Sequence, residues 1–184
     1  MMGIKQFNGE WVAREDRVRF RFNTTEDEEY SFWLTRRMAI RLMPAMEQSI
    51  VRLEAAQPGM TATDASTQHM LTEIKRDAFL QTADFSTPYS AQPQQLPLGD
   101  EPLLITDAQL SLQPHGALQI IFQKKTAEVT QSCQLNLQAP LVHGMIHLIH
   151  QCMGKAEWAL APPSTTQHPE AAADTPLTAQ VYKH

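Results

Sequence analysis

The sequence has little of the material from which catalytic loops and metal clusters are usually built. Its 184 residues include seven glycines and two cysteines. It contains no Gly-rich phosphate loop, GxSxG elbow, CxxC pair, or kinase or Rossmann fingerprint. With so few glycines, there is little scope for the tight loops that cradle phosphates. We therefore expect a non-enzymatic protein that works without a cofactor.

Long apolar runs and a cysteine framework are also lacking. No uninterrupted apolar stretch approaches the roughly 20 residues that a membrane helix requires. The first residues show no apolar run of the kind found in signal peptides. Cys133 and Cys152 lie in a predicted strand and a predicted helix, which favours buried, reduced thiols over a disulfide. These features predict a cytoplasmic protein with no membrane partner.

Positive charge is in deficit. Lys and Arg number 15 against 20 Asp and Glu, and the formal net charge is −5. This balance argues against non-specific binding of nucleic acid over the whole surface, although a local basic patch would still attract phosphate. Hydrophobic residues make up 42 % of the chain, enough for a packed core.

In the first part of the sequence, apolar and polar residues alternate as they do in half-buried strands. Residues 7–13, 17–23 and 30–35 read as three strands. Thr35 is a candidate N-cap for an amphipathic helix over 36–56, and a Pro-Gly pair follows it. The spacing thus predicts a strand–strand–strand–helix unit, and we place its boundary at residue 57.

The same order recurs later in the chain. Residues 104–112, 116–125 and 130–137 are strand candidates, and a helix is expected over 140–160. The second unit therefore spans 103–161. The intervening residues 58–102 combine a helix near 65–80 with a Pro- and Gln-rich connector, and residues 162–184 form a polar tail.

Two such units predict an α+β fold. Each has one apolar sheet face and one helix to cover it, and each alone is small enough to be only marginally stable. We expect one antiparallel sheet of about six strands, with two helices on one face and an inserted helix. The recurrence favours an internal repeat, and chance recurrence of a common pattern is the alternative.

This order of elements resembles the fold of the Whirly proteins and related single-stranded-DNA-binding transcriptional regulators. The resemblance covers residues 5–57 and 103–160 and rests on element order, since the lysine-rich loop typical of Whirly proteins is missing. The resemblance implies that the protein binds single-stranded nucleic acid. This implication rests on similarity of fold alone.

The predicted open face of the sheet carries the first set of candidate residues. Three arginines alternate on one strand, and a tryptophan and amide side chains share their face, so that phosphates and bases could bind there. In the alternative, Asp27 and Glu29 neutralise the arginines as cross-strand pairs, or another segment or a second copy covers the face. The candidate residues for binding nucleic acid or a partner are Arg17, Arg19, Arg21, Trp33, Gln119, Gln123 and Asn136.

A histidine stripe on the last helix is the second candidate. His143, His147 and His150 follow an i, i+4, i+7 spacing, opposite a face formed by Val142, Met145, Ile149 and Cys152. An i, i+4 pair of histidines can chelate a transition metal, but the HExxH pattern is missing. We expect these histidines to be exposed, with a functional metal site as the alternative.

Together these features predict a non-enzymatic binding or interaction protein that forms a homodimer through an exposed sheet or helix surface. Binding of single-stranded nucleic acid by the arginine-bearing face is the first alternative. Metal binding by the histidine stripe is the second.

Overall fold

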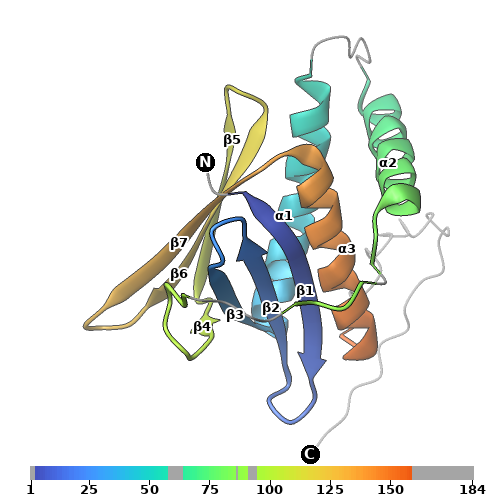
Figure 1. Cartoon of the computed structure of the whole chain (residues 1–184). Coiled ribbons are helices and arrows are strands. Elements are labelled where there is room, and N and C mark those ends of the chain that lie inside the picture. Colours follow the sequence, from blue (N-terminus) through green and yellow to red (C-terminus); the bar gives the residue numbers. More distant parts are fainter. Residues whose placement is uncertain (1–2, 58–63, 86, 91–94, 159–184) are drawn as a thin grey trace, which may run out of the picture.

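The computed structural model describes residues 3–57, 64–85, 87–90 and 95–158. Within these residues the chain forms strands and helices in the order βββα–α–ββββα (Figure 1). The elements are β1 (Ile4–Val12), β2 (Arg17–Thr24), β3 (Glu29–Thr35), α1 (Arg36–Ala55), α2 (Ala65–Thr82), β4 (Leu103–Leu104), β5 (Asp107–Gln113), β6 (Ala117–Lys125), β7 (Thr130–Leu137) and α3 (Ala139–Lys155).

The strands form two sheets rather than the single sheet expected. One has the order β1-β2-β3-β4 and the other the order β5-β6-β7. The predicted strand 104–112 is divided at its start. The N–H of Ile105 donates to the carbonyl of Trp33 on β3, whereas the N–H of Thr106 donates to the carbonyl of Gln123 on β6. The short β4 thus pairs in parallel with β3, and the chain then passes into the second sheet. The expectation of one shared sheet was wrong for this reason.

Each helix reaches the opposite half of the chain. α1 follows β3 directly, and the hydroxyl of Thr35 caps it by accepting from the N–H of Met38 at 3.2 Å. α1 and α3 pack against each other, and among the strands α1 contacts β5 most and α3 contacts β1 most. Gly9 permits this approach, because a Cβ there would lie 3.0 Å from Cys152 Sγ on α3.

The two sheets and two helices enclose one continuous core. Phe32 on β3 and Phe122 on β6 are both fully buried, and their ring centroids lie 5.3 Å apart. Phe22 on β2 extends the aromatic cluster across the first sheet, with its ring centroid 6.0 Å from that of Phe32. Buried residues of α1 and α3, such as Met46 and Met145, belong to the same core.

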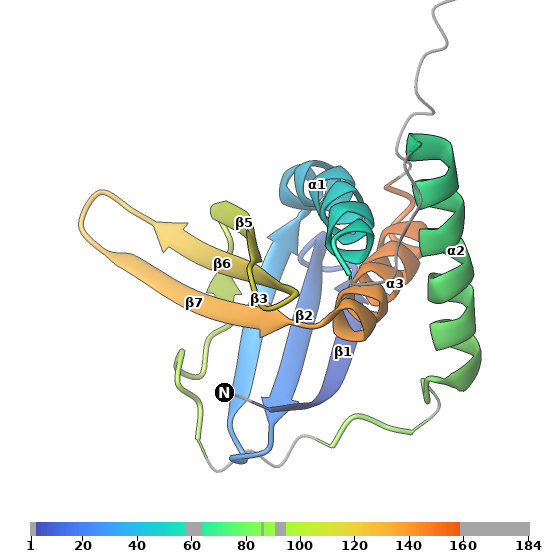
Figure 2. The same cartoon turned by 90° about the horizontal axis from the view of Figure 1, so that it is seen from above.

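α2 lies outside this core, against both α1 and α3 (Figures 1 and 2). Of its 18 residues only Thr72 is buried, whereas Met70 and Ile74 are more than half exposed. Within the described residues, no helix combines the length and apolar character needed to cross a membrane.

The α+β class and the inserted helix are confirmed, with α2 close to the predicted 65–80. The three-strands-then-helix order of the first unit is also confirmed. The division into units at residues 57, 102 and 161, and the internal repeat itself, stay predictions. The predicted tail, 162–184, lies outside the described residues.

The aromatic contact between the sheets leads to a first prediction. Phe122→Ala removes a fully buried ring and should lower the free energy of unfolding by about 3–5 kcal/mol, measured by urea denaturation. Val129→Ala is the matched control, because Val129 is 57 % exposed and its loss should change stability by no more than about 0.5 kcal/mol. Equal effects of the two changes would contradict a core shared by both sheets.

Candidate binding surfaces and the interhelical cleft

The arginine-bearing face of β2 is partly occupied by other parts of the chain. Arg21 donates from Nη2 to Asn8 Oδ1 at 2.9 Å, and its guanidinium lies 4.7 Å from the centre of the Tyr89 ring. Arg19 donates from Nε to Ser31 Oγ at 3.4 Å. These arginines and Arg17 are all partly buried. Two of the three guanidinium groups thus have partners within the protein.

The acidic residues expected to neutralise these arginines form other contacts. Asp27 forms an ion pair with Lys5 at 2.8 Å. Glu29 is buried and accepts a hydrogen bond from the hydroxyl of Tyr89 at 3.0 Å. Burial and the neighbouring Glu29 raise the pKa of Tyr89, so its phenol stays protonated and remains a donor. Tyr89 therefore links Glu29 to Arg21.

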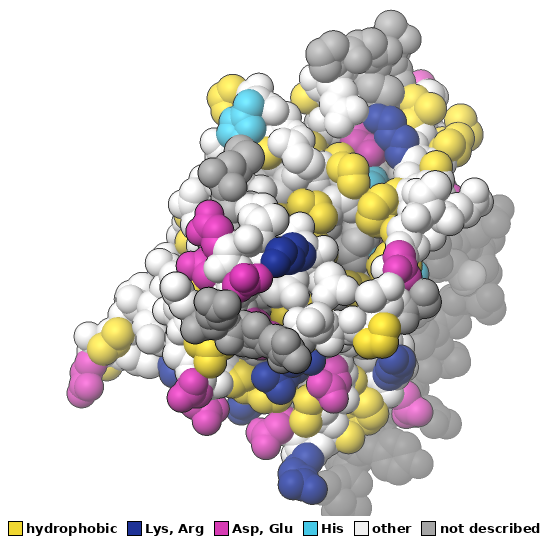
Figure 3. Space-filling model, in the orientation of Figure 1, with side chains coloured by type: hydrophobic (Ala, Val, Ile, Leu, Met, Phe, Trp, Pro, Cys, Tyr) yellow, Lys and Arg dark blue, Asp and Glu magenta, His cyan; other side chains and the backbone are white. Residues whose placement is uncertain are grey.

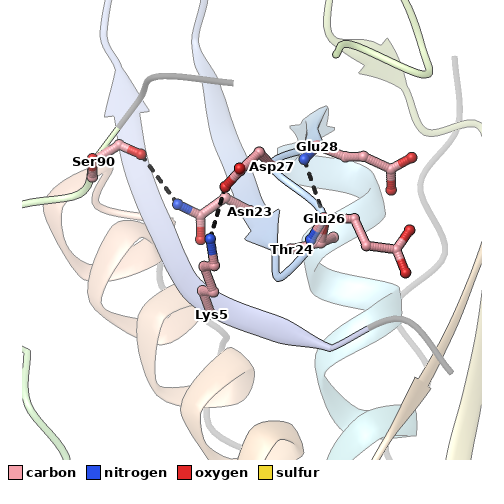
Figure 4. Close-up of polar contacts among 7 residues, drawn as sticks. All are labelled: Lys5, Asn23, Thr24, Glu26, Asp27, Glu28 and Ser90. Atoms are coloured by element: carbon pink, nitrogen blue, oxygen red, sulfur yellow. Dashed lines mark hydrogen bonds and ion pairs between the residues drawn. The ribbon is translucent and has the colours of Figure 1, made fainter. Parts of the chain in front are cut away.

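The segment around Tyr89 is held against one end of the first sheet. Asn23 donates from Nδ2 to the carbonyl of Ser90 at 3.1 Å, next to the ion pair of Lys5 with Asp27 (Figure 4). The hydroxyl of Thr24 accepts from the N–H of Glu28 and so fixes the acidic turn. The side chains of Glu26 and Glu28 point away from Lys5 in this view. The acidic turn is therefore held by hydrogen bonds to Thr24 and by the ion pair of Asp27 with Lys5.

Trp33 is half-buried between Arg19 on β2 and Leu104 on β4. On the face drawn in Figure 3, basic side chains are separated by acidic and neutral ones. Binding of single-stranded nucleic acid by the arginine-bearing face of β2 stays a prediction.

The second sheet carries a row of neutral polar side chains on its outer face. Ser111, Gln119 and Asn136 lie side by side on β5, β6 and β7. Ser111 Oγ donates to Gln119 at 3.3 Å, and Gln119 donates to Asn136 at 3.4 Å. Gln123, on the same face, has a buried Oε1 with no hydrogen-bond partner among the described residues. The predicted amide residues therefore share one surface, separate from that of the arginines.

The histidine stripe is not uniformly exposed, contrary to expectation. His143 is 3 % exposed, and its Nε2 lies 3.0 Å from Glu54 Oε1 on α1. Glu54 is 2 % exposed, and its second oxygen, Oε2, is buried without a hydrogen-bond partner among the described residues. The prediction failed because α1 packs beside α3 and covers this end of the stripe.

The other two histidines have separate partners. His150 Nε2 lies 2.7 Å from Glu47 Oε1 on α1, and His147 Nε2 lies 2.9 Å from Gln151 Nε2. Burial, together with His150 and Arg76, lowers the pKa of His147. In the described part of the chain, no three His, Cys, Asp or Glu side chains gather in a way that could hold a metal ion. Metal binding by the stripe stays a prediction.

A cleft of about 740 Å³ lies where α2 stands against α1 and α3. Its walls include His143, His147 and His150 from α3, with Glu47 from α1 and Glu73 from α2. Apolar side chains, among them Ile50 and Ile146, complete the lining. Small-molecule pockets commonly measure about 300–1,000 Å³. No local sequence pattern indicates this cleft, since its walls come from three separate helices.

The two cysteines are free and buried, as predicted. Burial raises the pKa of Cys133 to about 12 and that of Cys152 to about 11. Since the thiolate is the nucleophile, both side chains are unreactive at neutral pH.

Comparison of the chain with protein-family models, with curated proteins and with solved structures finds no match in any of the three. The resemblance to the Whirly fold is thus neither supported nor contradicted.

The two histidine–glutamate pairs differ in burial, which leads to a second prediction. His143→Ala leaves the buried carboxylate of Glu54 unpaired and should cost about 3–5 kcal/mol of unfolding free energy. His150→Ala removes the same kind of partner from Glu47, whose side chain is 50 % exposed, and should cost about 0–1 kcal/mol. Chemical denaturation of both variants at pH 7 measures the difference. A cost for His143→Ala no greater than that for His150→Ala would disprove the prediction.

Proposed function

We propose that the protein is a non-enzymatic interaction protein that acts as a homodimer, with β7 as the pairing surface. The supporting observation is the outer edge of β7. In the order β5-β6-β7 this strand bonds to β6 on one side only. An unpaired edge exposes N–H and C=O groups that another strand can bond.

β7 lacks the features that usually protect a free edge. Its eight residues, TQSCQLNL, include no charged residue and no proline. By contrast, the edge strand β1 carries Lys5 and Glu10 and is packed against α3. The other edge of the second sheet, β5, begins with Asp107 and is packed against α1. Charges and covering elements are common protections against edge pairing, and β7 is the long edge with the least of both.

The position of β7 suits pairing with another molecule. The β6–β7 hairpin projects from the body of the protein in both views (Figures 1 and 2). Gln131, Ser132 and Gln134 on this strand are exposed. Antiparallel pairing of β7 with β7 of a second copy is a self-complementary, two-fold contact. It joins two three-stranded sheets into one of six strands and satisfies the free backbone groups of both edges.

The third prediction tests this pairing by adding charge to the edge. The wild-type protein should be a dimer in sedimentation equilibrium. The double change Ser132→Lys and Gln134→Lys should weaken dimerisation by about tenfold or more, because like charges opposite one another destabilise a strand pair. Circular dichroism should show an unchanged fold.

The matched control places two lysines on the other edge of the same sheet face, as Gln109→Lys and Ser111→Lys on β5. This variant should dimerise like the wild type. A wild-type protein that stays monomeric at high concentration, or a control that dissociates as readily as the β7 variant, would refute the proposal.

A further inference from the structure

The cleft between the helices exists because α2 is poorly packed. α1 and α3 lie directly against one another and bury seven and nine residues respectively. α2 contacts both but buries only Thr72. Helices in proteins gain most of their stability from tertiary packing. The space of about 740 Å³ beneath α2 is therefore one that a bound molecule can fill while adding contacts to all three helices.

A buried polar pair holds one wall of the cleft in place. His143 lines the cleft, and its Nε2 lies 3.0 Å from Oε1 of the buried Glu54 on α1. The second oxygen of Glu54, Oε2, is buried without a hydrogen-bond partner among the described residues. The His143 ring is therefore fixed against α1 at this end of the cleft.

The charged side chains that line the cleft favour a cationic ligand. Three carboxylates, Glu47, Glu73 and Asp77, face one guanidinium, Arg76. Arg76 forms an ion pair with Asp77 at 3.0 Å, and Glu47 contacts His150. Glu73 has no ion-pair or hydrogen-bond partner in the described part of the chain. Apart from its histidines, the lining therefore carries a net negative charge.

The rest of the lining is apolar. Ile50, Leu80 and Ile146 come from α1, α2 and α3 respectively, so apolar surface is available from every side of the cleft. A pocket of this kind matches a molecule that has an apolar body and one polar group.

We propose that this cleft binds a small organic amine. Its ammonium group pairs with the carboxylate of Glu73, and its apolar part packs against Ile50 and Ile146. This site is independent of the β7 edge, so either proposal can hold without the other.

Three probes of similar shape and different charge test the ligand class. They are 2-phenylethylamine, 2-phenylethanol and 3-phenylpropanoate, each titrated at pH 7.5 into protein labelled at the isoleucine methyl groups. We expect saturable shifts of Ile50 and Ile146 with the amine, at a dissociation constant about tenfold or more below that of the alcohol. The carboxylate should bind most weakly.

Substitutions of two exposed acidic residues, and one that fills the cleft, test where the amine binds. Glu73→Gln should weaken binding of the amine about fivefold or more and leave binding of the alcohol unchanged. Glu128→Gln is the control, because Glu128 is exposed between β6 and β7 and should affect neither probe. Leu80→Trp, which fills the cleft, should abolish binding of the amine.

Each contrary result has a distinct meaning. Equal binding of the amine and the alcohol, tighter binding of the carboxylate, or no effect of Glu73→Gln would overturn the amine as ligand class. Absence of saturable shifts with all three probes would overturn the cleft as a binding site.

Discussion

The structure depends on the contact of Phe32 with Phe122. Neither three-stranded meander can bury its apolar face alone, and a unit of that size is marginal by the scaling of surface with volume. The aromatic contact places the apolar faces of the two sheets around one interior, and α1 and α3 close it from the remaining side. Among the strands, each of these two helices contacts those of the other half more than those of its own. The two halves of the chain are therefore not independent in space. The packing of this shared core sets the positions of the β2 face, the β7 edge and the interhelical cleft.

The elements of the fold could be predicted from local pattern, but their association could not. Alternation along Arg17–Thr24 and Thr130–Leu137 marks both strands clearly, and the fully buried Phe20 and Phe22 follow it. Period-two alternation says which side of a strand is apolar and nothing about which strand lies beside it. The division at Ile105 and Thr106 depends on two backbone hydrogen bonds to different sheets. Such bonds have no side-chain signature, so the change of sheet was not visible in the sequence.

The candidate sites show the same limit. The spacing of His143 and His150 correctly places both on one side of a helix, yet their partners lie 89 and 103 residues away in sequence. Glu47 and Glu54 are also seven residues apart, as expected when two antiparallel helices meet in register. That matching interval is the one signal in the sequence that points to the pairing of the two helices. For Tyr89, within a Pro- and Gln-rich connector, no periodic pattern indicated its contact with Arg21.

The two buried thiols give the molecule internal reporters of its own opening. Cys133 belongs to the second sheet, while Cys152 lies on α3 against Gly9 of the first. Both are protonated and shielded in the native state, so a thiol reagent can modify them only after the surrounding structure opens. The rates of the two modifications therefore compare the opening of one sheet with that of the other. A single common rate would describe one cooperative unit, and two rates would describe a chain whose halves can separate while each keeps part of its structure.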